Sequence, residues 1–268
     1  MSSPITVRRE SGTCWIGLNR PAKRNALDLA TVEAIDAALI QARREPCVVV
    51  IHSTTPGIFA AGVDIAELLE RRADDALMAP NATVFERLEE HRWPTIALID
   101  GPAIGGGAEL ALSCDFRIGS NSARFGQPEL SLGILAGAGG NWRLPQVVGL
   151  QRARRMLFLG EVLDATRAYD LGLLDELTDD LGARASEYLD AIGTRSWRAL
   201  ELTKLSLRSQ RRSTMTFDIT AQALLFESED KQERMRRFLE ARRQRRAAAA
   251  SGERADQAIA GRDDSAEA

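Results

Sequence analysis

The sequence of 268 residues has few of the side chains that most often bind metals or form disulfides. Its three cysteines, Cys14, Cys47 and Cys114, are odd in number and widely spaced, which argues against a disulfide framework. No pair of them has the spacing of a metal site. The two histidines, His52 and His91, lie far apart and form no H-E-x-x-H motif. Acid–base chemistry in this chain therefore falls to carboxylates, and we expect no metal ion.

The chain also lacks long apolar runs and a strong excess of either charge. No run approaches the roughly 18 residues that span a bilayer, and the first residues lack the apolar core of a secretory signal. The formal net charge of −3 provides no overall attraction to nucleic acid or anionic membranes. With 44% hydrophobic residues, the chain can bury a sizeable core. We therefore expect a reduced, cytoplasmic protein without a membrane or nucleic-acid partner.

Common phosphate-binding and nucleophile motifs are missing as well. The sequence contains neither a G-x-x-x-x-G-K-[ST] phosphate loop nor a G-x-S-x-G nucleophile elbow. The glycines at 105–107 and 137–140 do not complete G-x-G-x-x-G, the dinucleotide-binding fingerprint. These absences argue against a nucleotide-binding α/β protein or a serine hydrolase.

Strand and helix patterns alternate along the first two-thirds of the chain. Apolar or β-branched runs predict strands at 13–18, 47–51, 95–99 and 116–119. Apolar spacing over 28–41 predicts a helix. This alternation is typical of an α/β fold with a largely parallel sheet. From about residue 185 only helices are predicted, at 185–192, 196–210, 216–227 and 230–246.

Two glycine-rich segments follow predicted strands directly. Residues 57–65 follow the strand at 47–51, and residues 101–110 follow the strand at 95–99. Each runs through small residues into a helical pattern, so backbone N–H groups are exposed at a helix N-terminus. Two such turns facing each other can hold one developing oxyanion between two amides. The alternative is that the glycines only permit tight strand-to-helix turns.

Four motifs in order carry a family resemblance: F-A-A-G-x-D-I from Phe59, G-x-x-I-G-G-G-x-E-L from Gly101, F-G-Q-P-E-x-x-L-G from Phe125 and G-A-G-G-x-x-R-L from Gly137. Together with N-R-P at 19–21 and N-A-L at 25–27, they resemble the crotonase family, the enoyl-CoA hydratase/isomerase superfamily. The resemblance covers about residues 5–240. It implies an α/β fold with a spiral core of β-β-α turns and an all-helical C-terminal trimerisation region.

The resemblance also implies how the chain is divided. We expect a spiral core with the active site over 1–195 and a helical oligomerisation region over 196–246. The last segment, 247–268, is rich in alanine and has almost no large apolar residue except Ile259. We expect it to be a disordered tail, because it offers too little apolar area to offset its ordering entropy. The family forms homotrimers, commonly stacked as dimers of trimers.

Residue by residue, the resemblance assigns a site. The backbone N–H groups of Val63 and Gly106 match the two donors of the family's oxyanion hole, although the family commonly has a smaller residue at the valine position. Glu109 and Glu129 match its two catalytic glutamates. Residues of the first turn match CoA-binding positions, and two nearby basic residues are candidates for the CoA phosphates, although solvated surface charge explains the pair equally well. The first-turn residues are Ala61, Val63, Asp64 and Ile65, and the two basic residues are Lys23 and Arg24.

Both glutamates together favour enoyl-CoA hydration, a syn-type addition of water across the 2,3-double bond of a 2-trans-enoyl-CoA that gives a 3-hydroxyacyl-CoA. CoA is then part of the substrate, and no separate cofactor is needed. The sequence leaves open which glutamate is the acid, which acyl chain is preferred and whether trimers pair. One alternative is a Δ3-Δ2 isomerase or other acyl-CoA reaction of the same family. Another is a non-catalytic acyl-CoA-binding or RNA-associated scaffold.

Overall fold

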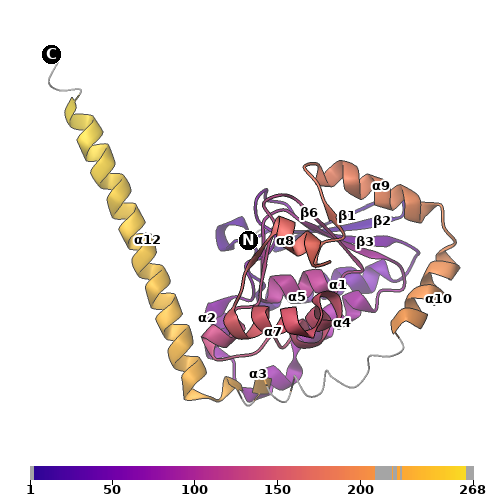
Figure 1. Ribbon diagram of the computed structural model, residues 1–268, viewed down its shortest axis with the longest axis horizontal. Coiled ribbons are helices and arrows are strands. Elements are labelled where there is room, and N and C mark those ends of the chain that lie inside the picture. The colour runs from indigo at the N-terminus through magenta and orange to yellow at the C-terminus, as the bar shows by residue number, and fades with distance from the viewer. Residues whose placement is uncertain (1–2, 209–218, 220–221, 224, 264–268) are drawn as a thin grey trace.

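The computed structural model describes residues 3–208, 219, 222–223 and 225–263 (Figure 1). The strands are β1 (Ile5–Glu10), β2 (Thr13–Leu18), β3 (Val48–Ser53), β4 (Thr95–Ile99), β5 (Pro102–Ile104), β6 (Phe116–Gly119), β7 (Arg124–Gly126), β8 (Leu163–Asp164) and β9 (Glu176–Leu177). The α-helices are α1 (Leu29–Ala42), α2 (Ile65–Glu70), α3 (Ala73–Met78), α4 (Pro80–Glu89), α5 (Gly106–Leu112), α6 (Gly140–Val148), α7 (Leu150–Leu159), α8 (Ala165–Asp170), α9 (Leu181–Gly193), α10 (Trp197–Arg208) and α12 (Glu229–Asp263). Two short 3₁₀ helices complete the elements, η1 (Pro21–Lys23) and η2 (Glu129–Leu132).

The strands form two sheets of mixed direction. The larger sheet has the order β1-β2-β3-β4-β6-β9, in which only the β1–β2 pair is antiparallel. The smaller sheet has the order β5-β7-β8, with β5 and β7 parallel and β7 and β8 antiparallel. The predicted α/β class and the largely parallel pairing of the main sheet are therefore confirmed.

Helices cover both faces of the larger sheet, and β3 shows how the sequence arranges this. Successive side chains of a strand point to opposite faces. Val49 and Ile51 join the core cluster that contains α1, α4 and α5, whereas Val48 and Val50 pack with α9. All four side chains are almost completely buried. The continuous apolar run therefore marks a strand that is buried on both faces.

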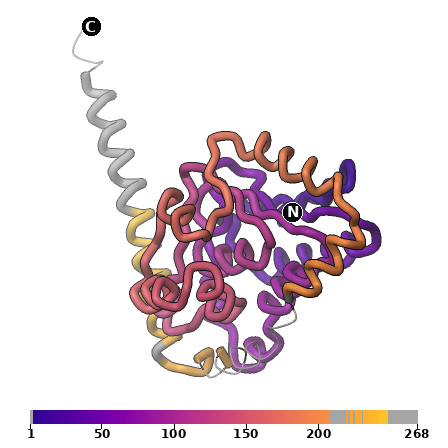
Figure 2. The backbone as a smooth tube through the Cα atoms, turned by 45° about the vertical axis from the view of Figure 1, so that its right-hand side comes forward, coloured from indigo at the N-terminus to yellow at the C-terminus, as the bar shows by residue number. Residues whose placement is uncertain are grey.

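The C-terminal third is helical wherever the structure describes it. α9 and α10 pack on the body, and α12 extends away from it (Figures 1 and 2). Lys231 fixes the start of α12 by donating from Nζ to the carbonyl oxygens of Leu69 and Arg71 at 3.2 and 2.8 Å. Within the described residues, no helix is long and apolar enough to cross a bilayer.

Two predictions for this region meet the structure only in part. Most of the helix predicted at 216–227 lies outside the described residues. Residues 247–263, expected to be a disordered tail, continue α12 as helix, in keeping with the high helix propensity of their alanines. The last five residues are outside the described chain. The division into core, oligomerisation region and tail remains a prediction.

The topology places the two glycine-rich turns side by side. β3 and β4 are parallel neighbours, so their carboxyl ends meet at the same edge of the sheet. From that edge, Ala60 N–H donates to the Pro102 carbonyl at 3.0 Å, and Ile104 N–H donates to the Ala60 carbonyl at 3.1 Å. A bridge between Leu27 and Val63 extends the contact on the other side. In open α/β sheets, ligand sites form outside the carboxyl ends of parallel strands.

Candidate active site

The two turns approach each other more closely than side chains would permit. Gly62 and Gly105 have positive φ angles of 102° and 54°, which L-residues with side chains rarely adopt. A Cβ atom built on Gly107 would lie 2.2 Å from the Ala60 carbonyl oxygen. These glycines are therefore required by backbone conformation and by close backbone approach, as the turn interpretation of the sequence proposed. That requirement does not compete with a binding role, because the same approach brings the two helix starts together.

Val63 and Gly106 meet where the turns converge, and both line a cavity. In the bridge to Leu27, Gly62 supplies the carbonyl and Asp64 supplies the N–H, so the N–H of Val63 itself points away from the bridge. Gly106 is the first residue of α5, where N–H groups have no intrahelical acceptor. A Cβ on Gly106 would lie 3.5 Å from Val63 N and only 2.8 Å from Val63 Cγ2. A side chain at position 106 would therefore require the Val63 side chain to shift.

Glu109 is held as a carboxylate acceptor at the start of a second helix. It lies in the first turn of α5 with 3% of its surface exposed. Its Oε1 accepts from Ala138 N–H at 2.8 Å and from Gly140 N–H at 2.9 Å, at the N-terminus of α6. Two N–H donors and the positive end of a helix dipole stabilise negative charge on this oxygen.

Glu129 has a different environment in the same cavity. It begins η2 and is 9% exposed. Burial raises the pKa of Glu129 well above its usual range, and the negative charge of nearby Glu109 raises this pKa further. The side-chain amide of Gln127 lies next to Glu129, with one terminal atom 2.9 and 3.1 Å from the two carboxyl oxygens. The site therefore contains one carboxyl group that accepts two backbone N–H bonds and one whose pKa is raised by burial and by its neighbour.

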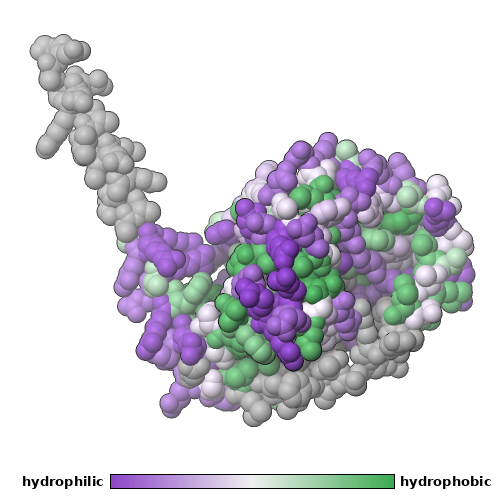
Figure 3. All heavy atoms as spheres, in the orientation of Figure 1, coloured by the Kyte–Doolittle hydropathy of each residue, from purple (hydrophilic) through white to green (hydrophobic). Residues whose placement is uncertain are grey.

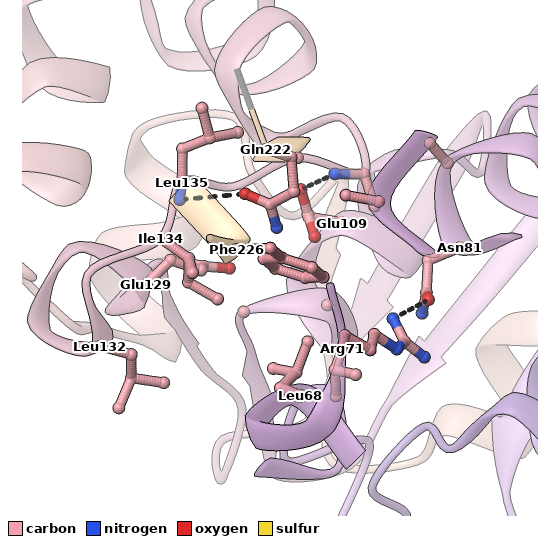
Figure 4. Close-up of a pocket in the computed structure, with 18 of the residues that line it drawn as sticks. Leu68, Arg71, Asn81, Glu109, Glu129, Leu132, Ile134, Leu135, Gln222 and Phe226 are labelled. Atoms are coloured by element: carbon pink, nitrogen blue, oxygen red, sulfur yellow. Dashed lines mark hydrogen bonds between the residues drawn. The ribbon is translucent and has the colours of Figure 1, made fainter. Parts of the chain in front are cut away.

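The two carboxyl groups line one cavity. Much of its wall is an apolar cluster that includes Leu68, Leu132, Ile134 and Phe226. Figure 4 shows these side chains around Glu109 and Glu129. The C-terminal region completes the wall, because Phe226 is 2% exposed and Gln222 Oε1 accepts from Leu135 N–H at 3.4 Å.

A buried ion pair supports the turn that binds Glu109. Arg143 is 2% exposed and donates from Nη1 to the Ala138 carbonyl at 2.9 Å. Its Nε and Nη2 donate to Glu89 Oε2 at 2.9 and 2.7 Å. The pair thus joins α6 to α4 directly behind the Ala138–Gly140 donors. In the sequence, this arginine stands in the motif that begins at Gly137, but nothing there indicates that Glu89 is its partner.

The other residues assigned by resemblance are placed differently. Ala61 and Ile65 line the cavity with Val63, whereas Asp64 caps α2 by accepting from Ala66 N–H at 3.0 Å. Lys23 and Arg24 are exposed and do not line the cavity; the Arg24 carbonyl accepts from Ala61 N–H at 3.1 Å, next to its rim.

Sequence reasoning missed several polar or aromatic side chains of the wall. Arg71, Asn81, Gln222 and Phe226 all line the cavity. Arg71 and Asn81 come from two separate segments, Gln222 and Phe226 from a third, and none of the four belongs to a motif. A helical pattern at 216–227 was the only sign of the last two, and it did not indicate which residues face inward.

Comparisons with known proteins agree on one family. The family model described as enoyl-CoA hydratase/isomerase matches residues 8–246. The chain is 33% identical over 249 residues to the crotonyl-CoA hydratase of Syntrophomonas wolfei, covering 89% of this chain and 96% of that protein. It is 32% identical over 249 residues to the short-chain-enoyl-CoA hydratase of Clostridium acetobutylicum, with coverages of 89% and 95%. The crystal structure of an enoyl-CoA hydratase from Bacillus halodurans has the same fold, with a TM-score of 0.82 at 23% identity over 87% of this chain and 99% of that one.

Proposed function

Because the chain belongs to the enoyl-CoA hydratase/isomerase family and has its crotonase fold, we propose that it hydrates 2-trans-enoyl-CoA thioesters to 3-hydroxyacyl-CoA. Family membership implies a reaction on an acyl-CoA substrate. The observation that supports hydration within it is the pair of glutamates with unequal surroundings in one cavity. The relatives from Syntrophomonas wolfei and Clostridium acetobutylicum, both named as hydratases, support the same reaction.

The thioester carbonyl oxygen accepts from the N–H groups of Val63 and Gly106. Negative charge that develops on this oxygen when water adds at C3 is stabilised by the two donors and by the start of α5. Because backbone amides supply the donors, the bulk of Val63 does not remove one. It narrows the space beside the thioester instead.

Glu109 and Glu129 divide the proton transfers. Glu109, in its charged form, takes a proton from the water whose oxygen bonds to C3. Glu129, in its protonated form, gives a proton to C2, and the electron pair of the double bond forms the new C2–H bond. In a syn addition the hydrogen and the hydroxyl arrive on the same face of the double bond, so both groups must reach it from one side of the cavity that they line. The proposal thus takes Glu109 as the base and Glu129 as the acid, two roles that the sequence left open.

CoA extends from the thioester along the first turn. Ala61 and Ile65 at the cavity wall are positioned to contact pantetheine, with Asp64 fixing the helix start behind them. Lys23 and Arg24 are exposed near the same rim and are placed to meet the CoA phosphates.

The test is loss of the enoyl-thioester absorbance when purified protein meets 2-trans-enoyl-CoA substrates of increasing chain length. Hydration predicts turnover that depends on enzyme concentration, with 3-hydroxyacyl-CoA as product. Absence of turnover at every chain length, together with retained acyl-CoA binding, would contradict the proposal and favour a binding scaffold. Turnover of 3-enoyl-CoA without water addition would replace it with the isomerase.

A further inference from the structure

One part of the otherwise apolar cavity wall carries a cation and an amide. Arg71 follows α2, Asn81 lies in the first turn of α4, and both line the cavity. Arg71 Nη1 donates to Asn81 Oδ1 at 3.3 Å. Figure 4 draws the pair on one side of the cavity, with Leu132 and Glu129 on the opposite side of the view.

The pair is built into the wall rather than lying loose on the surface. Asn81 is 6% exposed and the Arg71 side chain is 14% exposed. The backbone of Arg71 is fixed from outside the cavity, because Lys231 Nζ donates to its carbonyl at 2.8 Å. Arg71 is the one arginine or lysine among the described residues that line the cavity.

Within the described residues, one hydrogen-bond donor of this pair has no acceptor. Asn81 Nδ2 is buried and has no acceptor in the part of the chain that the structure describes. Arg71 Nη2 lies 3.5 Å from Glu67 Oε2, a carboxylate that is 39% exposed and also accepts from Leu29 N–H at 3.0 Å. Asp75 also lines the cavity, but it is exposed and its Oδ2 accepts from Arg72 N–H at 2.8 Å.

An arrangement of this kind costs free energy until an acceptor arrives. A buried amide donor without an acceptor and a guanidinium facing apolar side chains are both unfavourable. An alkyl chain filling the cavity would remove the remaining water and make both costs larger. A carboxylate offers two oxygens, one for the guanidinium and one for the amide, and it neutralises the charge.

We propose that the cavity takes an acyl chain ending in a carboxylate, which Arg71 and Asn81 Nδ2 bind, so that the substrate is the mono-CoA thioester of a 2-enedioic acid. This inference rests on the proposed hydration and specifies its substrate class. Arg71 and Asn81 act as specificity residues, with no part in the proton transfers.

The test compares matched substrates that differ only at the chain end. For each chain length of six, eight and ten carbons, kcat/KM is measured for the 2-enoyl-CoA with a terminal methyl group and for its counterpart with a terminal carboxylate. Charge-assisted hydrogen bonds predict that the wild-type protein prefers the carboxylate member of at least one pair by about 10- to 100-fold. Because both members share CoA and the reacting double bond, the ratio reports only on the tail.

Variants assign that preference to the pair. Arg71→Met removes the charge but keeps an unbranched side chain, and it is expected to lose about 10- to 100-fold in kcat/KM on the carboxylate substrate, with less than about threefold change on the methyl substrate. Asn81→Leu, which keeps the size, is expected to show the same selective loss to a smaller degree. Arg72→Met is the matched control, because Arg72 is the next residue, is exposed and does not line the cavity. Arg72→Met should leave kcat/KM unchanged for both the carboxylate and the methyl substrate.

The outcomes separate this inference from the proposed function. Turnover of the methyl substrates with no preference for any carboxylate substrate overturns the substrate class and leaves hydration standing. Equal losses on both members in Arg71→Met place Arg71 at the CoA moiety or in the fold and also overturn it. If neither the methyl nor the carboxylate substrates are turned over, the proposed hydration itself is overturned. The wild-type ratio is decisive even if a variant folds poorly.

Discussion

At the scale of single residues, the site depends on unequal surroundings for two identical side chains. Glu109 accepts two backbone N–H bonds at the start of α6, whereas Glu129 is buried beside that negative charge. The first arrangement stabilises a carboxylate and the second disfavours one. A base and an acid can therefore coexist near neutral pH without a histidine.

Removing either proton-transfer group is expected to slow the reaction without emptying the site. Glu109→Gln and Glu129→Gln should each lower kcat by about 10²- to 10⁴-fold, the range typical of acid–base groups. Acyl-CoA binding, measured by calorimetry, should persist because glutamine keeps the size. The double variant should lose less than the product of the single losses, because the two groups act together. Near-normal hydration by Glu129→Gln would contradict the assignment and leave Glu109 as the sole proton carrier.

The raised pKa of Glu129 predicts a pH dependence. Because the protonated form donates to C2, kcat/KM should fall as pH rises through this pKa and the proton is lost. In Glu109→Gln the neighbouring negative charge is gone, so ionisation of Glu129 becomes easier. The alkaline limb of the residual activity should therefore move to lower pH. Rate profiles of both proteins check this, and a limb that stays in place or moves to higher pH would refute the coupling.

Motifs predicted the two glutamates of the candidate site but not the wall around them. Glu109 and Glu129 each stand in a local pattern with the glycine or proline that shapes the adjoining turn. Arg71 and Asn81 have no such pattern. They come together only when the segment after α2 packs beside α4, an event that depends on tertiary contacts and leaves no periodic trace in the sequence.

At the scale of elements, length decided which strands the sequence revealed. The predicted runs at 13–18, 95–99 and 116–119 coincide with β2, β4 and β6. β5, β7, β8 and β9 have only two or three residues each, too few for an alternating pattern. β1 is longer but escaped notice because five of its six residues are exposed. It is an edge strand and needs no apolar face.

The connection between α4 and α6 supplies a prediction on stability and activity together. Arg143→Met leaves Glu89 inside the protein without its cation, and breaking a buried pair in this way typically costs about 3–5 kcal/mol of unfolding free energy. The loss of the bond to the Ala138 carbonyl should also lower kcat, because the donors of Glu109 lose support. Denaturant unfolding and steady-state kinetics provide the two measurements.

A matched control is available on the surface. Arg155 bonds Glu161 at 2.9 Å, but their side chains are 49% and 33% exposed. Arg155→Met should therefore leave the free energy of unfolding almost unchanged. If Arg143→Met were equally harmless, the buried pair would have no supporting role.

At the scale of the whole molecule, an apolar area predicts self-association. Leu150, Phe158 and Leu159 on α7 and Val162 after it are between 51% and 71% exposed. Figure 3 shows hydrophobic side chains gathered near the middle of the face on which α7 and α8 lie in Figure 1. Clustered exposure of this kind usually marks an interface. We expect homotrimers or dimers of trimers, as the family resemblance implies.

Light scattering at micromolar concentration tests the assembly. The wild-type chain should have the mass of three or six copies, and Phe158→Asp should lower that mass by burying a charge in the interface. Val7→Asp is the control, since Val7 is similarly exposed but lies on edge strand β1. A wild-type monomer would contradict the expectation.

The central claim is that two glutamates add one water molecule across the double bond from the same face. The most direct measurement is hydration of a 2-trans-enoyl-CoA in D₂O, with the product analysed by NMR. The account predicts one deuterium at C2, a hydroxyl at C3 and a single syn configuration. An anti product, or a mixture of configurations at C2, would contradict the placement of both carboxyl groups. A product with a shifted double bond and no hydroxyl would contradict hydration.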